Sequence, residues 1–189
     1  MATGKLIIFS APSGSGKTTI VKELLKIFPQ FEFSISATSR SPRGQEQDGI
    51  DYFFLSQEEF QAKVKANEFV EWEEVYNGTC YGTLKSEMER IWSKGNVIIF
   101  DVDVMGGINL KRIFGDNARS IFIMPPSVEV LRERLIGRGT DSEETIEKRV
   151  AKAAFEISKA DEFDNIVIND ILADAVAQTK VIIEEFLAK

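Results

Sequence analysis

A glycine-rich segment near the start of the chain lies between an apolar run and an amphipathic run. The apolar run, Leu6–Phe9, has the length and composition of a buried strand. The amphipathic run extends to Phe28 and repeats its apolar residues at helical spacing. A strand, a glycine-rich loop and a helix in this order are typical of a phosphate-binding P-loop. The loop residues are Ala11, Pro12, Ser13, Gly14, Ser15, Gly16, Lys17, Thr18 and Thr19.

The residue types in this loop suit a triphosphate. Gly14 and Gly16 allow a tight turn whose N–H groups point inward at phosphate oxygens. Lys17 can reach the β- and γ-phosphates, and the hydroxyl of Thr18 can bind Mg²⁺. Ala11 stands where the usual pattern has glycine, but the remaining spacing is intact. A glycine-rich turn that binds nothing is the alternative, and the agreement of strand, loop and helix favours a nucleoside triphosphate site.

Composition narrows the class of protein. The chain has 189 residues, 43% of them hydrophobic, which suits one domain. A net charge of −7 disfavours a general nucleic-acid surface. The absence of histidine excludes Ser-His-Asp and Cys-His catalysis and histidine-bound zinc. A single cysteine, Cys80, excludes an internal disulfide and fits a reducing compartment. No signal-peptide pattern or long apolar run occurs, so we expect a cytoplasmic protein without membrane or nucleic-acid partners.

Hydrophobic periodicity predicts further strands and helices that alternate along the chain. The expected strands are 31–35, 97–100, 120–124 and 163–168. The expected helices are 56–67, 83–94, one after Ser127, one after Ser142, and a final helix. The buried face of the final helix is predicted to comprise Leu172, Val176, Ile183 and Phe186. This alternation indicates an α/β fold with a parallel sheet of about five strands flanked by helices.

Two polar segments carry candidate site residues. In the loop-like stretch 36–54, Arg40 and Arg43 are forked donors suited to phosphate, with the hydroxyls of Ser36 and Tyr52 nearby in sequence. In the other segment, Arg134 and Arg138 lie four residues apart on one predicted helix and Arg149 on the next. Taken alone, both segments also fit ordinary solvated charge.

Acidic residues follow a predicted central strand. Asp101 lies where Walker B carboxylates orient Mg²⁺ or its waters. Alternation sends Asp103 to the same side as Asp101. The run from Asp103 to Gly106 also fits the Asp-x-x-Gly element of GTPases, but the chain has no Asn-Lys-x-Asp motif.

Almost the whole chain resembles the guanylate kinase family. The resemblance rests on the P-loop and on the run from Thr38 to Tyr52, which reads Thr-Ser-Arg-x-Pro-Arg-Gly-x-Glu-x-x-Gly-x-Asp-Tyr. Further motifs follow in the family order: Glu71-Trp72, Tyr81-Gly82-Thr83, Asp101-Val102-Asp103, Gly137-Arg138 with a later Arg149, and Ile168-Asn169-Asp170. The family implies a P-loop NTPase-type core with inserted GMP-binding and lid subdomains. We expect the core at 1–35, 89–126 and 160–189, the GMP-binding segment at 36–88 and the lid at 127–159.

The resemblance also implies a role for each site residue. The residues implied to bind GMP are Ser36, Arg40, Arg43, Tyr52, Glu71, Tyr81, Thr83 and Asp103. Arg134, Arg138 and Arg149 match the lid arginines that close over the transferring phosphate, and with Lys17 they are the catalytic candidates. Asn169 is implied to contact the adenine of ATP. Thr18 and Asp101 are the expected Mg²⁺ ligands, Asp101 through water.

The chemistry of guanine agrees with this assignment. Guanine offers donors at N1 and N2, which the carboxylates of Glu71 and Asp103 can accept, and an acceptor at O6 for a hydroxyl such as Thr83. Adenine has an acceptor at N1, so a carboxylate there would reject AMP. We therefore expect transfer of the γ-phosphoryl of ATP to GMP, and we leave dGMP use and oligomeric state open.

Two alternatives remain at this point. Guanylate-kinase-like domains also serve as non-catalytic interaction modules, but those modules lose parts of the P-loop and lid, which this chain keeps. A kinase for another small phosphorylated acceptor is the second alternative, and Glu71 together with Asp103 argues for guanine.

Overall fold

The computed structural model describes residues 4–76, 78–137, 139 and 142–189. The chain forms two compact units. We call the part made of Gly4 and residues 32–98 the first unit, and residues 5–31 with 99–189 the second unit. The boundary passes through β2 (Phe31–Phe33) and β7 (Val97–Asp101).

The main sheet has five strands in the order β2-β7-β1-β8-β9. Within the second unit, β1 (Leu6–Ser10) pairs in parallel with β8 (Ala118–Met124), and β8 pairs in parallel with β9 (Asn165–Ile168). All five residues of β1 are buried, as expected for a parallel strand covered on both faces. The predicted parallel sheet is therefore confirmed.

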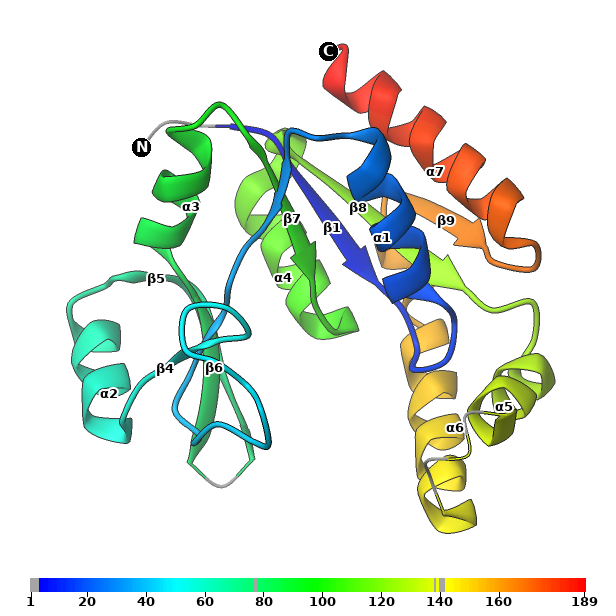
Figure 1. Ribbon diagram of the computed structural model, residues 1–189, viewed down its shortest axis with the longest axis horizontal. Helices are drawn as coiled ribbons and strands as arrows, with labels where there is room; N and C mark the ends of the chain where they lie inside the picture. Colours follow the sequence, from blue (N-terminus) through cyan, green and yellow to red (C-terminus); the bar gives the residue numbers. More distant parts are fainter. Residues whose placement is uncertain (1–3, 77, 138, 140–141) are drawn as a thin grey trace. The chain divides into compact units, whose positions relative to one another are not determined.

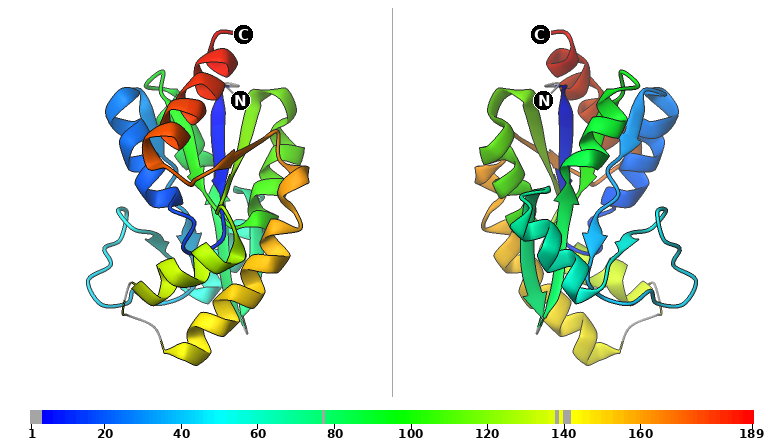
Figure 2. Two further views of the ribbon diagram at one scale, coloured as in Figure 1. Left: turned by 90° about the vertical axis from the view of Figure 1, so that its right-hand side faces the viewer. Right: turned by 90° about the vertical axis from the view of Figure 1, so that its left-hand side faces the viewer.

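Helices cover both faces of the sheet in the second unit. Helices α1 (Lys17–Ile27) and α7 (Leu172–Leu187) lie on one face, and α4 (Val104–Phe114) lies on the other (Figures 1 and 2). The helix α1 buries Ile20, Val21 and Leu24 as its spacing predicts. The sequence patterns above do not predict α4.

Helices α5 (Val128–Gly137) and α6 (Glu143–Ile157) pack against each other in the second unit. Their contact buries Leu131, Leu135, Ile146 and Ala153. Ser142 caps α6 as predicted, because its hydroxyl accepts a hydrogen bond from the backbone N–H of Thr145. Two short 3₁₀ helices, η1 (Gly115–Asn117) and η2 (Ala160–Glu162), precede β8 and β9.

The first unit contains a second sheet of four strands in the order β4-β3-β6-β5. The strands are β3 (Ala37–Thr38), β4 (Phe53–Phe54), β5 (Phe69–Tyr76) and β6 (Thr79–Leu84). The strand β6 is antiparallel to both β3 and β5, whereas β3 and β4 are parallel. The sequence patterns above do not predict these four strands.

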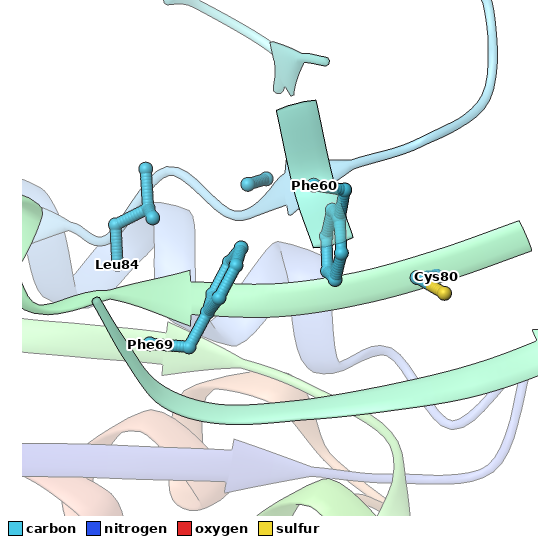
Figure 3. Packing of buried hydrophobic residues seen from close by; sticks show 5 residues of the cluster. Phe60, Phe69, Cys80 and Leu84 are labelled. Atoms are coloured by element: carbon cyan, nitrogen blue, oxygen red, sulfur yellow. The ribbon is translucent and has the colours of Figure 1, made fainter. Parts of the chain in front are cut away.

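A small apolar core holds this sheet to α2 (Gln57–Lys65). Figure 3 shows Phe60 of α2 stacked on Phe69 of β5, with ring centroids 4.5 Å apart, beside Leu84 and Cys80. Cys80 is buried, and burial raises the pKa of its thiol. Cys80 is thus a packing residue, as its sequence context predicts.

Two sequence predictions need correction. The helix expected over 83–94 is α3 (Lys85–Trp92), because Thr83 and Leu84 continue β6. Leu172, expected on the buried face of the last helix, is 40% exposed in the first turn of α7, while Ala175 and Thr179 are buried instead.

Among the residues that the structure describes, no helix is both long and apolar enough to cross a membrane.

Candidate active site

The P-loop connects β1 to α1 and has the conformation that its glycines predict. Gly14 and Gly16 have φ angles of 98° and 89°, in the region that favours glycine. The hydroxyl of Ser15 donates to the carbonyl of Pro12 at 2.7 Å, and the backbone N–H of Ser15 donates to the same oxygen at 3.1 Å. These bonds close the turn and place the N-terminus of α1 at the loop, where partial positive charge favours phosphate.

Asn169, the residue that follows β9, supports this loop through a side-chain hydrogen bond. Its side chain is only 5% exposed, and Nδ2 donates to the carbonyl of Ser15 at 2.7 Å. A Cβ on Gly16 would overlap Nδ2, so glycine is required here by packing as well as by φ. The adenine contact implied for Asn169 stays a prediction.

Lys17 pairs with the Walker B candidate. Its Nζ forms an ion pair with the Asp101 carboxylate and donates to the carbonyl of Val102 at 3.2 Å. Asp101 ends β7, so the sheet brings it to the P-loop from 84 positions further along the chain. A cationic group and a carboxylate thus meet where the phosphates and metal are expected.

A cleft of about 420 Å³ opens at this point. Its walls are the P-loop, residues 101–103, and Arg149, Lys152 and Glu156 from one face of α6. Sequence reasoning missed Lys152 and Glu156, although their spacing of three and seven residues from Arg149 places all three on one helical face. The cleft therefore gathers more charge than the motifs indicate.

Glu156 is the buried acid of this cleft. Burial raises the pKa of its carboxyl, and the negative charge of Asp103 acts in the same direction. The nearby charges of Lys152 and Lys17 oppose the shift, and Lys152 Nζ lies 3.7 Å from Glu156 Oε1. The electrostatics of the cleft thus depend on residues from three elements.

The lid candidates lie at two places in the second unit. Arg149 Nη1 donates to the Ser13 hydroxyl of the P-loop at 2.9 Å. Arg134 lines a second pocket, of about 310 Å³, together with Gly14, Asn169 and other residues, and its Nη2 donates to the carbonyl of Asn169 at 3.0 Å. Arg138 lies outside the described residues.

In the first unit, Arg40, Tyr52 and Tyr81 come together. Arg40 Nε donates to the Tyr81 hydroxyl at 3.1 Å, and the guanidinium carbon lies 5.0 Å from the centre of the Tyr52 ring. The two tyrosine rings meet edge to face at 5.9 Å. Burial raises the pKa of Tyr52, so its hydroxyl is a neutral donor. A guanidinium and two hydroxyls are a suitable donor set for a phosphate.

Glu71 and Thr83 form the second pair of this unit. They are opposite each other on β5 and β6, and Thr83 Oγ1 lies 2.8 Å from Glu71 Oε1, to which it donates. This pairing exists because Thr83 belongs to a strand and not to the predicted helix. A carboxylate and a hydroxyl thus lie side by side, with the hydroxyl hydrogen donated to the carboxylate, and the guanine contacts implied for both residues stay a prediction.

The remaining predicted residues have separate positions. Ser36 precedes β3, and its carbonyl accepts from the backbone N–H of Phe53 at 2.9 Å. The side chain of Arg43 is exposed, and its backbone N–H donates to Glu46. Asp103 belongs to the second unit, where it caps α4 by accepting from the N–H of Gly106 at 2.8 Å. The guanine contact implied for Asp103 stays a prediction.

Comparison with known proteins gives consistent results. A family model described as "Guanylate kinase" matches residues 3–186. A guanylate kinase of Bacteroides thetaiotaomicron is 55% identical over 187 residues, which is 99% of this chain and 92% of the relative. A guanylate kinase of Porphyromonas gingivalis is 55% identical and covers 98% of this chain and 99% of its own length.

A solved structure agrees with these relatives. The crystal structure of guanylate kinase from Anaplasma phagocytophilum superposes with a TM-score of 0.72 at 29% identity. It covers 98% of this chain and 87% of its own. The matches extend over both units, and they include the P-loop, the Arg40 segment and residues 127–159. The chain belongs to the guanylate kinase family.

Proposed function

We propose that this chain is an ATP:GMP phosphotransferase, which transfers the γ-phosphoryl of ATP to GMP and gives ADP and GDP. The observation that carries the proposal is the P-loop cleft, in which Lys17 meets Asp101 beneath an ordered glycine-rich loop in a chain of this family. Such a cleft supplies the donors that a transferring phosphoryl group needs.

The donor triphosphate would bind at the second unit. The N–H groups of the P-loop and the N-terminus of α1 would hold the phosphates, while Lys17 would exchange Asp101 for a phosphate oxygen. Arg149, already bonded to Ser13, would bring a further positive charge to the loop. The pocket between Gly14, Arg134 and Asn169 is our candidate for the adenine ring.

The acceptor would bind at the first unit. Arg40, Tyr52 and Tyr81 would bind the phosphate of GMP, with Arg43 as the further donor that the family pattern implies. Ser36 is implied to be a hydroxyl at a guanine-reading position. The Glu71 carboxylate would accept from the guanine edge, and the Thr83 hydroxyl would stand beside it. Asp103 would supply the second carboxylate.

The reaction requires no general base. A phosphate monoester has a second pKa of about 6, so the acceptor is already a nucleophilic dianion at neutral pH. Catalysis then depends on alignment and on neutralising charge at the transferring group. Lys17 and the lid arginines Arg134, Arg138 and Arg149 would supply that positive charge, and the lid would exclude water.

The donor set of the cleft fits a magnesium ion. Thr18 offers a hydroxyl and Asp101 a carboxylate, and both are hard oxygen ligands of the kind Mg²⁺ prefers. We propose that these residues hold the ion, Asp101 through water. When bound, Mg²⁺ neutralises charge on the β- and γ-phosphates.

We also keep the three-part division of the chain as a proposal, with a GMP-binding segment at 36–88 and a lid at 127–159 inserted into the core. A cytoplasmic location is proposed because the single cysteine fits a reducing compartment and ATP is the co-substrate. An interaction module without activity is disfavoured, since Lys17 and Asp101 are both present and paired.

The test is an ADP-release assay with Mg-ATP and GMP, dGMP, AMP, UMP or CMP in parallel. We expect turnover with GMP and none above background with AMP. In Glu71→Gln the KM for GMP should rise at least about tenfold, because an amide donor replaces an acceptor. Equal turnover with AMP and GMP would overturn the guanine assignment, and no turnover despite GMP binding would favour the interaction module.

A further inference from the structure

The N–H donors of the Arg40 guanidinium are almost all engaged in hydrogen bonds within the first unit. A guanidinium carries five N–H donors. Nη1 donates to Glu46 Oε2 at 2.6 Å and to the carbonyl of Ser41 at 3.0 Å, and Nη2 donates to Glu46 Oε1 at 2.8 Å. Nε donates to the Tyr81 hydroxyl at 3.1 Å. One Nη2 hydrogen is committed neither to Glu46 nor to Ser41, and the Tyr52 hydroxyl also interacts with this guanidinium.

The remaining Nη2 hydrogen lies on a defined edge of the guanidinium. Glu46 takes the end-on edge, which is formed by Nη1 and Nη2. The other edge, formed by Nε and Nη2, faces Tyr81. The Tyr81 oxygen accepts from Nε, so its own hydrogen can be donated elsewhere. The Nε–Nη2 edge thus lies among tyrosine hydroxyls, which can donate their own hydrogens to a ligand.

Glu46 is itself fixed by the backbone. Its Oε2 accepts from the N–H of Arg43 at 2.7 Å, and its own N–H donates to the carbonyl of Arg43 at 3.1 Å. The hydrogen bonds from Arg40, which are the largest cause, and from the N–H of Arg43 lower the pKa of the Glu46 carboxyl to about 2. The carboxylate is therefore charged at neutral pH and is held by contacts on two sides.

We propose that Glu46 is a positioning residue, which holds Arg40 end-on so that its Nε–Nη2 edge and the Tyr81 hydroxyl face the acceptor phosphate. The inference rests on the proposed function, because it takes the phosphate of GMP as the ligand of Arg40. In this arrangement Glu46 stays bound to Arg40 when the phosphate arrives. The opposite role, a carboxylate that occupies the phosphate position and must leave, would not require its second anchor at the backbone of Arg43.

The two roles predict opposite changes in the KM for GMP when Glu46 is removed, and steady-state kinetics distinguishes them. We expect Glu46→Ala to raise the KM for GMP about tenfold, with the KM for ATP unchanged and kcat reduced much less, because Arg40 loses two charge-assisted bonds and its orientation. Glu46→Gln, which keeps one acceptor, should give an intermediate KM. In an Arg40→Ala background, Glu46→Ala should have no further effect, since Glu46 acts through Arg40.

Two controls keep the outcomes distinct. Glu68→Gln removes an exposed carboxylate–lysine pair of the same unit, formed with Lys63 at 2.7 Å, and should leave both KM values unchanged. Thermal unfolding of each variant shows that it is folded. An unchanged or lower KM for GMP in Glu46→Ala, with a raised KM in Arg40→Ala, would overturn the positioning role alone. An unchanged KM in Arg40→Ala would remove Arg40 from the phosphate site and overturn the positioning role, whereas the turnover with GMP would still support the proposed kinase; absence of turnover in the unaltered protein is what would overturn the proposed function.

Discussion

Asn169 Nδ2 donates a 2.7 Å hydrogen bond to the carbonyl of Ser15 and occupies the space beside Gly16 that a Cβ would fill. Asn169 and Ser15 are 154 positions apart in the sequence, and they meet because β9 ends at Ile168, next to the P-loop. The conformation of the loop thus depends on a residue outside the P-loop motif. The hydrogen bond from the Asn169 amide to this buried carbonyl holds the loop backbone in one conformation.

Asn169→Ala should weaken ATP binding, because the P-loop loses the hydrogen bond that fixes its backbone at Ser15. The variant leaves the buried Ser15 carbonyl without its partner, which costs about 1–3 kcal/mol of the free energy of unfolding. We expect the KM for ATP to rise about tenfold, with a much smaller change for GMP. Kinetics and urea unfolding measure both effects, and Asn117→Ala, an exposed site of the same unit, should change neither. Equal changes in the two KM values would argue against a local role.

Gly16→Ala should abolish ATP binding for a steric reason. The new Cβ would overlap the Asn169 amide, and φ at this position is 89°. Gly95→Ala is the matched control, because Gly95 has a φ of 76° but open space around it. That control should lose only about 1 kcal/mol of stability and keep its activity. Calorimetric titration with ATP tests the pair, and tight binding by Gly16→Ala would refute the assigned loop packing.

Lys17→Met should remove turnover and spare the acceptor site. Lys17 pairs with Asp101 in the second unit, whereas the residues around Arg40 belong to the first unit. We expect kcat to fall by at least about three orders of magnitude, since the charge on the phosphoryl group loses its main side-chain partner. GMP binding, measured by calorimetry without ATP, should change less than about threefold. Substantial turnover in this variant would exclude Lys17 from the reaction.

Glu32 should make the stability of the first unit depend on acid pH. Burial raises the pKa of its carboxyl, but hydrogen bonds from Asn96, Lys94 and Arg90 outweigh this and lower the pKa from 4.5 to about 2. A lowered pKa contributes stability that is present above about pH 4.5 and is lost as the pH falls toward about 2. Because the Glu32 side chain is 25% exposed, we expect a solvent-screened contribution of about 1–2 kcal/mol.

The matching measurement compares urea unfolding of the unaltered protein and Glu32→Gln from pH 7 to pH 3. The variant should be less stable near neutrality, and the difference should shrink steadily below about pH 4.5. Glu23→Gln, which removes an exposed pair with Lys26, should show almost no difference at any pH. A difference for Glu32→Gln that stays constant down to pH 3 would contradict the assigned pKa.

Several features could be predicted because they are encoded locally. The apolar run Leu6–Phe9 becomes β1, and the spacing of Ile20, Val21 and Leu24 gives α1 its buried face. Gly14 and Gly16 adopt the positive φ angles that a P-loop requires. The helix cap at Ser142 could be predicted for the same reason, because a cap depends on residues within one turn of the helix.

Other features were missed where local patterns are weak or ambiguous. The four strands of the second sheet carry little periodic signal, and two of them have only two residues each. The run after Thr83 is amphipathic enough to favour a helix that begins two residues too early. The helix α4 was missed as well, because its first turn contains Gly106 and Gly107. Neither of these missed features changes the prediction of a parallel main sheet.

The sequence by itself therefore determined the α/β class, the P-loop and the family, because each depends on neighbouring residues or on a fixed order of motifs. Only the tertiary structure decided the pairing of Thr83 with Glu71, the place of Asn169 under Ser15, and the fixation of Arg40 by Glu46 and Tyr81. The first two depend on strand register and on where parallel strands end, and the third on how a loop folds back on itself. Such contacts join residues that no local pattern relates, so packing and hydrogen bonding across the fold had to select them.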